Sequence, residues 1–317
     1  MTRLLSLLAA LFSSCAFAQS LTPVTMQLNW HPQADFGGYF TAKAEGLYEK
    51  AGLDVTLKPG GPQLNIHQLL AAGQVDFVMG TSVRTMVIRN QGIPIVAVGA
   101  FYQRDPVTFM VHADSGYNKV SDLKGKPIYL PGIARLNYWP WLRQSLGFSD
   151  EQIKAYDRSY RALTLDKTAA SQGYLTEDGF AFKKLGMAGK SIWLAENGWN
   201  PYSSTLDTTE KQIAEKPKMI EAFLKATAEG YRRYLQNPAK AHALIRDYNA
   251  AMEHEQMDHA YSVMKSRGLI DPGGGVKIGS MTDVRWEQTF KLLSESGVLP
   301  ASFDYRKAYT LQFVNQL

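Results

Sequence analysis

The chain has 317 residues, of which 45% are apolar and 26 are glycines. This length and composition exclude a disordered polymer and predict two compact units around a large core. The 34 basic and 29 acidic residues leave a formal charge of +5 without a long run of one sign. This distribution argues against a nucleic-acid-binding stripe and leaves only a weak preference for anionic ligands open.

Residues 1–18 have the pattern of a secretory leader. Arg3 precedes an apolar run from Leu4 to Phe12, and Ala16-Phe17-Ala18 forms a small-x-small cleavage pattern. We therefore expect cleavage after Ala18 and a mature protein outside the cytoplasm. The apolar run is too short to span a bilayer, and no later segment offers the roughly 20 apolar residues that a membrane helix needs.

Cys15 is the only cysteine and lies inside this leader. Lipidation of Cys15 is the alternative to simple cleavage, but Phe12-Ser13-Ser14 is a poor match to the residues usual before a lipidated cysteine. Cleavage after Ala18 leaves a mature chain with no thiol, which excludes disulfides, thiolate metal sites and cysteine nucleophiles.

Apolar runs alternate with amphipathic segments along the first hundred residues. This spacing predicts a parallel sheet with right-handed helical crossovers. The expected strands are 26–30, 54–58, 74–79 and 93–101, and the expected helices are 39–52, 65–73 and 82–92. Gly52, Gly73 and Gly92 stand where the three helices end.

A second unit begins near residue 107 and has a less regular pattern. We expect strands at 127–130, 153–160 and 191–198, a loop feeding a helix over 131–147, and a helix around 165–186. After residue 209 the pattern becomes helical, and 216–238 is a long amphipathic helix that begins near Pro217.

No Gly/Ser-rich linker separates the two units. We therefore expect the chain to cross between them by two short strands, near Phe109 to His112 and near Ser203 to Thr208, which makes a hinge. The predicted boundaries are 19–110 and 205–317 for the first lobe and 111–204 for the second.

The stretch from Leu28 to Val55 is the first candidate site, because a loop between a strand and a helix is where open parallel sheets bind ligands. Trp30 and Tyr39 offer flat faces for stacking, and Gly38 allows close approach of the backbone. His31 is either a ligand donor or a loop residue. The alternative for Trp30 is a buried structural role.

The second strand-to-helix junction carries Gly80, Thr81 and Ser82 at a helix start. The hydroxyls either cap the helix or donate to a ligand, and capping suits at least one of them. Arg84 either pairs with an anionic group of the ligand or is solvated.

The second unit offers further candidates. Gly132 lies in a loop followed by Tyr138 and two tryptophans, and helical spacing requires some of these aromatic residues to be core. Tyr174 offers a stacking face. Glu177 and Asp178 are acceptors suited to the exocyclic amine of an aminopyrimidine, or else two acids on an exposed turn.

Several catalytic and metal-binding patterns are absent from the sequence. His254 and His259 are five residues apart, about 140° around a helix, whereas a zinc-binding HExxH pattern needs four. The stretch DPGGGVK lacks the ending of a phosphate-binding loop, and no Ser-His-Asp set or carboxylate pair has local support. We expect no metal, no cofactor and no catalytic residue.

The chain resembles the periplasmic substrate-binding proteins of ABC importers, in the branch of nitrate, sulfonate, taurine and thiamine-pyrimidine precursor binders. The resemblance rests on LNW followed by AKAEGLYEKAGLDV, then LLAAGQVDF, IPIVAVGAF, VSDLKGKPI and LPASFDYRKAYT, and covers nearly the whole mature chain. It implies an α/β, two-lobed type II periplasmic-binding-protein fold, each lobe a mainly parallel sheet flanked by helices, joined by two hinge segments.

The resemblance also implies a ligand in the cleft, closure of the lobes around it, a periplasmic location, and docking on a membrane permease driven by a cytoplasmic ATPase. Trp30, Tyr39, Tyr174 and Asp178 match the places where pyrimidine-precursor binders use aromatic stacking and an acid. The complete ligand-binding set that we predict is Trp30, His31, Gly38, Tyr39, Gly80, Thr81, Ser82, Arg84, Gly132, Tyr138, Tyr174, Asp178 and Tyr202.

The leading hypothesis is a non-enzymatic receptor for a small planar heterocycle, such as a hydroxymethyl- or aminomethyl-pyrimidine. The first alternative is an anion binder of the alkanesulfonate, taurine or nitrate type, which would use Thr81, Ser82, Arg84 and the Gly132 loop. The second is a pyrimidine-forming enzyme. The fungal synthases of the branch carry a cysteine-rich stretch and a histidine in the second strand-to-helix turn, and this chain has neither.

Overall fold

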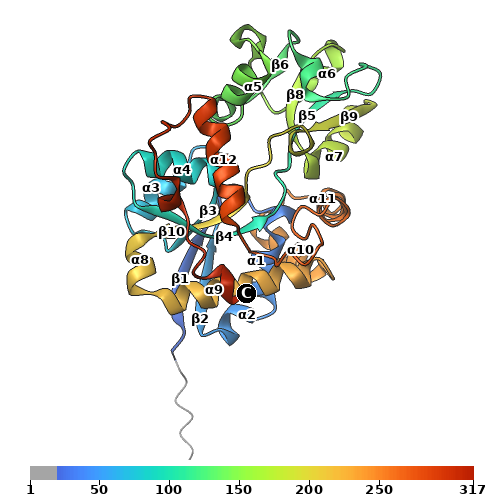
Figure 1. Cartoon of the computed structure of the whole chain (residues 1–317). Coiled ribbons are helices and arrows are strands. Elements are labelled where there is room, and N and C mark those ends of the chain that lie inside the picture. Colours follow the sequence, from blue (N-terminus) through green and yellow to red (C-terminus); the bar gives the residue numbers. More distant parts are fainter. Residues whose placement is uncertain (1–19) are drawn as a thin grey trace, which may run out of the picture.

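The computed structural model describes residues 20–317, so the predicted leader, its cleavage after Ala18 and Cys15 lie outside the described residues. Figure 1 shows two lobes, one built mainly from blue and orange segments and the other from green ones. Each lobe contains one sheet of five strands. None of the helices between residues 20 and 317 is long and apolar enough to cross a membrane.

The sheet of the first lobe has the strand order β2-β1-β3-β10-β4. β1 is parallel to β2 and β3, and β10 is antiparallel to both of its neighbours. The strands are β1 (Thr22–Gln27), β2 (Leu53–Lys58), β3 (Phe77–Thr81), β4 (Ile95–Tyr102) and β10 (Ser203–Thr209). β4 is buried at every position, as its apolar run predicts, whereas β2 alternates between buried and exposed residues.

Helices cover both faces of this sheet. They are α1 (Gly37–Ala44), α2 (Leu47–Lys50), α3 (Ile66–Ala71), α4 (Ser82–Asn90), α8 (Glu210–Glu215), α9 (Pro217–Tyr234), α10 (Ala239–Tyr248), α11 (His254–Ser266) and α12 (Asp283–Glu295), with 3-10 turns η1 (Ala34–Phe36), η6 (Tyr305–Ala308) and η7 (Val314–Gln316). The predicted amphipathic helix over 216–238 is confirmed as α9, whose apolar stripe faces the core.

The sheet of the second lobe has the order β7-β6-β8-β5-β9, and here β5 is the antiparallel strand. Its strands are β5 (Val107–His112), β6 (Ile128–Tyr129), β7 (Ile153–Lys154), β8 (Ala170–Tyr174) and β9 (Gly189–Trp193). Its helices are α5 (Trp139–Leu146), α6 (Arg161–Leu165) and α7 (Leu175–Leu185), with 3-10 turns η2 (Val120–Leu123), η3 (Gly132–Leu136), η4 (Asp150–Gln152) and η5 (Leu194–Glu196). The predicted two-lobed α/β architecture with mainly parallel sheets is confirmed.

Two of the predicted elements in the second lobe were wrong. The expected helix over 165–186 is strand β8 followed by helix α7, because 170–173 lies buried in the middle of the sheet. The expected strand over 153–160 keeps only its first two residues in β7, and the rest is a loop. This loop carries Arg158, which contacts Trp30 of the first lobe.

The chain crosses between the two sheets at 103–106 and at 194–202. β5 lies wholly in the second sheet and β10 wholly in the first, so the strands predicted to make the crossing do not make it. The two crossover segments are joined where the backbone N–H of Asp105 donates to the side-chain oxygen of Asn200 at 3.0 Å. The change of lobe thus falls in short loops, a few residues away from the predicted boundaries.

The lobes also touch on both sides of the crossovers. α11 of the first lobe packs beside α7 of the second, where Lys183 pairs with Glu255 and Lys184 with Glu253. α12 contacts α4 in its own lobe and α5 in the other, and Figure 1 shows it rising from the lower lobe toward α5.

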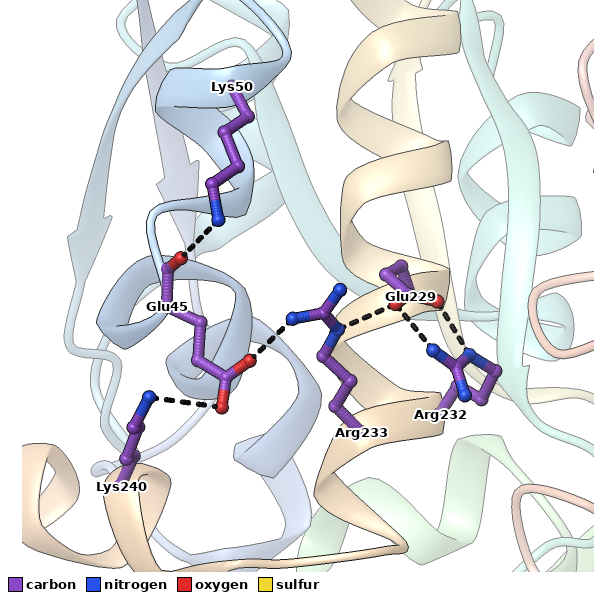
Figure 2. A network of polar contacts seen from close by, with 6 residues as sticks. All are labelled: Glu45, Lys50, Glu229, Arg232, Arg233 and Lys240. Carbon is purple, nitrogen blue, oxygen red and sulfur yellow. Dashed lines mark hydrogen bonds and ion pairs between the residues drawn. The ribbon is translucent and has the colours of Figure 1, made fainter.

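A polar network ties the helices of the first lobe together (Figure 2). Arg233 on α9 donates to Glu229 at 2.6 Å and to Glu45, which follows α1, at 2.9 Å. Arg232 makes two further hydrogen bonds to Glu229, both 2.6 Å, and Lys240 lies 3.6 Å from Glu45. The network fixes α1 relative to α9 and α10.

Candidate functional site

Trp30 lies in the loop after β1, at the carboxyl edge of the first sheet. Its ring is partly exposed, and the guanidinium carbon of Arg158 lies 4.4 Å from the ring centroid. Arg158 belongs to the second lobe, so the indole faces across the space between the lobes. His31 is exposed and sets its ring edge-on to Trp30 at 5.4 Å. Contact of either residue with a ligand stays a prediction.

Tyr174 lies at the end of β8, the matching edge of the second sheet. The side chain keeps 36% of its surface exposed, yet burial by the surrounding atoms raises the pKa of its phenol. Asp105, Glu177, Tyr156 and Arg158 also influence the pKa of this phenol.

A carboxylate on η1 joins the two lobes. Asp35 is buried, and its Oδ1 accepts hydrogen bonds of 3.0 Å from Tyr102 of the first lobe and from Thr176 of the second. The side-chain amide of Gln33 donates to its Oδ2 at 3.0 Å. The lobes are therefore held together through one acid at this point.

Two acids of the site have raised pKa values. Burial raises the pKa of Asp35, although its three hydrogen-bond donors oppose the shift. Burial, followed by the charge of Asp35, raises the pKa of Glu177 to about 7, against the opposing charge of Arg158. Neighbouring buried acids with raised pKa values are common at functional sites.

A small pocket lies between the lobes beside this acid pair. Its volume of about 10 Å³ holds about one water molecule and is too small for a heterocycle. The residues that line it are Gln33, Ala34, Asp35, Thr176, Glu177, Met252, Gln256 and Ala260. A ring-sized ligand requires the lobes to separate here.

The loop that presents Arg158 is strained. Arg158 and Tyr160 have φ angles of +60° and +55°, in the left-handed region that costs a residue with a side chain about 1–3 kcal/mol. Ser159 stabilises the turn, because its backbone N–H donates to Asp157 at 2.9 Å and its hydroxyl accepts from the N–H of Arg161 at 3.2 Å. Such strain clusters at ligand sites.

The predicted roles of Tyr39 and Gly38 were wrong. Tyr39 is fully buried in the first lobe, edge-on to Phe101 and Tyr231, so its ring has no face for a ligand. A Cβ on Gly38 would lie 2.1 Å from Tyr231, so this glycine is needed for the packing of α1 on α9 and not for a ligand.

The groups of the second strand-to-helix junction that we predicted to bind the ligand instead make contacts inside the protein. The hydroxyl of Thr81 caps α4 by accepting from the N–H of Arg84, and that of Ser82 donates to the carbonyl of Tyr202 at 3.1 Å. A Cβ on Gly80 would meet Asp207 at 2.2 Å. Of this junction, only the partly exposed Arg84 side chain is left for a ligand.

Three candidates of the second lobe and the hinge are buried. Tyr138 donates to Gln172 at 2.9 Å within the second lobe, and the Tyr202 oxygen accepts from the N–H of Thr282 at 3.0 Å. Asp178 lies 2% exposed, and Thr108 donates to it at 2.6 Å. Their assignment as ligand contacts was wrong, because all three side chains are buried inside the protein.

Gly132 is exposed and no atom lies within 4 Å of a Cβ built on it. Gly132 remains a predicted ligand contact. It has no packing requirement that demands glycine.

The sequence-based prediction missed Asp35 and Arg158 as site residues. Asp35 carries a signal, since it follows a strand at a sheet edge, but Arg158 was hidden inside an expected strand. Its position opposite Trp30 depends on how the two lobes meet, and local patterns do not encode that arrangement.

The larger cavity, about 480 Å³, lies elsewhere, between the second crossover and α12. Arg285 is one of its charged lining residues, and its guanidinium already donates to Asn200 and Pro201. The lining consists of Gly198, Asn200, Arg285, Gln288, Thr289, Lys291, Leu292 and Glu295, none of which lies at a strand end. Across the described part of the chain, no group of three or more His, Cys, Asp or Glu side chains is placed to hold a metal ion.

Comparison with solved structures defines the class of fold. The chain is similar to a putative periplasmic sulfonate-binding protein, SsuA, from Methylobacillus flagellatus KT, with a TM-score of 0.67 and 18% identity over 94% of each chain. The fold is therefore that of the periplasmic binding proteins.

The chain belongs to the NMT1/THI5-like family, which matches residues 33–241. It is 22% identical to the riboflavin-binding protein RibY of Chloroflexus aurantiacus, over 93% of this chain and 87% of that protein. It is 23% identical to the formylaminopyrimidine-binding protein of Halalkalibacterium halodurans, over 87% and 86%. A pyrimidine phosphate synthase of Legionella pneumophila is 20% identical over 92% of each chain, so the relatives include named binders and a named enzyme.

Proposed function

We propose that the protein is a solute receptor of an ABC import system and captures a small planar heterocycle as its two lobes close. The observation that carries the proposal is the contact of Trp30 from the first lobe with Arg158 from the second, where Arg158 also lies near Tyr174. Flat rings bind between aromatic faces, and polar groups around them set their orientation.

A thiamine pyrimidine precursor suits these groups. Glu177 is partly exposed near Tyr174 and, of the two acids predicted as acceptors for an exocyclic amine, is the one that lies at the interface. Two relatives named as binders carry flat heterocycles in their names, riboflavin and formylaminopyrimidine. The import role, a periplasmic location and a partner permease with its ATPase follow from the same resemblance and are part of the proposal.

Binding of an alkanesulfonate or a similar anion is the second candidate. It is favoured by the sulfonate-binding protein among the similar structures and by the positive charge of Arg158. It is weakened by the pairing of Thr81 and Ser82 inside the first lobe, which removes two of its expected anion contacts.

The named synthase among the relatives supports testing for enzyme activity. We propose that this chain is not such an enzyme. Metal analysis and an absorbance spectrum of the purified protein test this, because a pyrimidine-forming enzyme needs a bound metal or cofactor, and detection of either in stoichiometric amount contradicts the proposal.

The main experiment is calorimetry with a hydroxymethyl-aminopyrimidine, riboflavin and an alkanesulfonate. We expect a flat heterocycle to bind and Trp30→Ala to weaken it by well over tenfold, about 1.4 kcal/mol or more, because the exposed indole supplies a stacking face. Tyr39→Phe is the matched control, since its ring is buried and should leave the affinity unchanged. Tight binding of the sulfonate alone would refute the proposal.

A further inference from the structure

Arg158 is unusual among the charged residues of the site because its guanidinium covers the face of Trp30 at 4.4 Å. Within residues 20–317 its side chain forms no hydrogen bond and no ion pair within 4 Å of a carboxylate. Arg158 is exposed, and its backbone has a strained, positive φ angle. The stacking on Trp30 is therefore its main contact.

The guanidinium of Arg158 occupies the face of Trp30 on which a flat ligand would stack. A guanidinium is planar and positively charged, and the negative face of an indole attracts such a group when it lies within about 6 Å of the ring. The same face of Trp30 accepts one planar group at a time. Arg158 and a stacked ligand therefore compete for it.

The acids around the stack also point to a positive partner. Asp35 is buried, Glu177 lies beside it, and Arg158 is the cation that lowers the pKa of Glu177. When Arg158 leaves, the two acids lose this compensation. A ligand that replaces its charge restores this compensation, whereas an anion adds negative charge beside the two acids.

We propose that the Arg158 guanidinium stands in for the ligand and that the natural ligand is a flat group bearing a delocalised positive charge, held between Trp30 and Glu177 when Arg158 moves aside. An amidinium and a protonated aminopyrimidine share this chemistry, an N–C–N edge with donors beside a planar ring. The inference rests on the proposed function and specifies the charge of its ligand.

Three probes of nearly equal shape and different charge test the inference: benzamidinium, benzamide and benzoate. Calorimetry with the full mature chain at neutral pH should give the order benzamidinium, benzamide, benzoate, with the first at least tenfold tighter than the last. Arg158→Ala should tighten benzamidinium binding about five- to tenfold, because the internal competitor is gone.

Two variants make the result specific. Arg161→Ala removes a neighbouring exposed arginine at the start of α6 and should leave all three affinities unchanged. Glu177→Gln should reduce the preference for benzamidinium over benzamide about tenfold while benzamide binding stays similar. Thermal unfolding midpoints confirm that each variant is folded.

The opposite outcomes overturn the inference. If Arg158→Ala abolishes binding or benzoate binds best, Arg158 is an anchor for an anion. If none of the three probes binds either protein but the neutral ring of riboflavin does, the inference fails and the proposed function stands. If only an alkanesulfonate binds, both fail.

Discussion

Glu177 and Asp178 are neighbours in the sequence, but the structure gives them different surroundings. Glu177 is partly exposed beside Arg158 and Tyr174 at the lobe interface. Asp178 points into the second lobe, where it accepts from Thr108, and burial raises its pKa to about 7. A shift of one position along α7 thus separates Glu177, which is available to a ligand, from Asp178, which belongs to the core.

We predict that stability falls as pH rises through the range in which these acids ionise. The pKa of Glu177 is raised from 4.5 to about 7, so the folded state binds the proton more tightly than the unfolded one. By linkage, the free energy of unfolding decreases between about pH 4.5 and pH 7. Glu177→Gln should remove about 1–3 kcal/mol of this decrease.

Urea unfolding at pH 5 and pH 8 measures the effect. The groups that influence the pKa of Glu177 are Asp35, Gln33, Arg158 and Asp178. The raised pKa of Asp178 contributes a decrease of the same sign. Glu151→Gln on the exposed surface of the same lobe is the control. An unchanged pH dependence in Glu177→Gln would contradict the assignment.

At the scale of the elements, α1 and α9 pack so closely that small residues are required. A Cβ on Gly38 would lie 2.1 Å from the ring of Tyr231, and one on Gly230 would lie 2.2 Å from the carbonyl oxygen of Gly38. The same approach that defines this interface buries Tyr39 and removes it from the ligand site.

We predict that Gly38→Ala destabilises the protein by about 1–3 kcal/mol or more, because the helices must move apart. Gly132→Ala is the matched control, since nothing lies within 4 Å of the added Cβ. Urea unfolding compares the two. Equal stability of both variants would show that the interface adapts to the methyl group.

The network in Figure 2 predicts that the stability supplied by Glu229 on α9 is lost in acid. Hydrogen bonds from Arg232, ahead of those from Arg233, lower the pKa of Glu229 to about 2, so the stability that Glu229 supplies is present above about pH 4.5 and is lost as pH falls toward 2. Because the pairs lie near the surface, Glu229→Gln should cost only about 1 kcal/mol or less at pH 6. Acid unfolding followed at low and high salt measures the loss, and a variant identical to the parent protein at pH 6 and pH 3 would contradict it.

At the scale of the whole molecule, Thr176 couples the lobes because its hydroxyl donates to Asp35 across the interface at 3.0 Å. We predict that Thr176→Val shifts the ligand-free protein toward an open form and weakens ligand binding about three- to tenfold, since closure loses a hydrogen bond worth about 1 kcal/mol. Small-angle X-ray scattering should show a larger radius of gyration for the variant.

Thr164→Val on an exposed helix of the second lobe is the control for this change. Addition of the heterocycle should contract both proteins. Scattering profiles that do not change with any candidate ligand would count against lobe closure as the mechanism.

Local sequence signals were sufficient for most elements of the first lobe. Gly52, Gly73 and Gly92 all have positive φ at the ends of helical segments, as predicted, and the apolar run of β4 is buried on both faces. These features depend on contacts between residues a few positions apart or on burial alone, so composition and periodicity encode them.

The sequence by itself therefore determined the class of fold, the two lobes and Trp30 as a candidate at a sheet edge. Only the tertiary structure decided which side chains reach the interface: it buried Tyr39 and Asp178 and brought Arg158 and Asp35 into the site. The physical reason is that a periodic pattern indicates that a face is covered, whereas the identity of the covering element depends on packing between segments far apart in the chain.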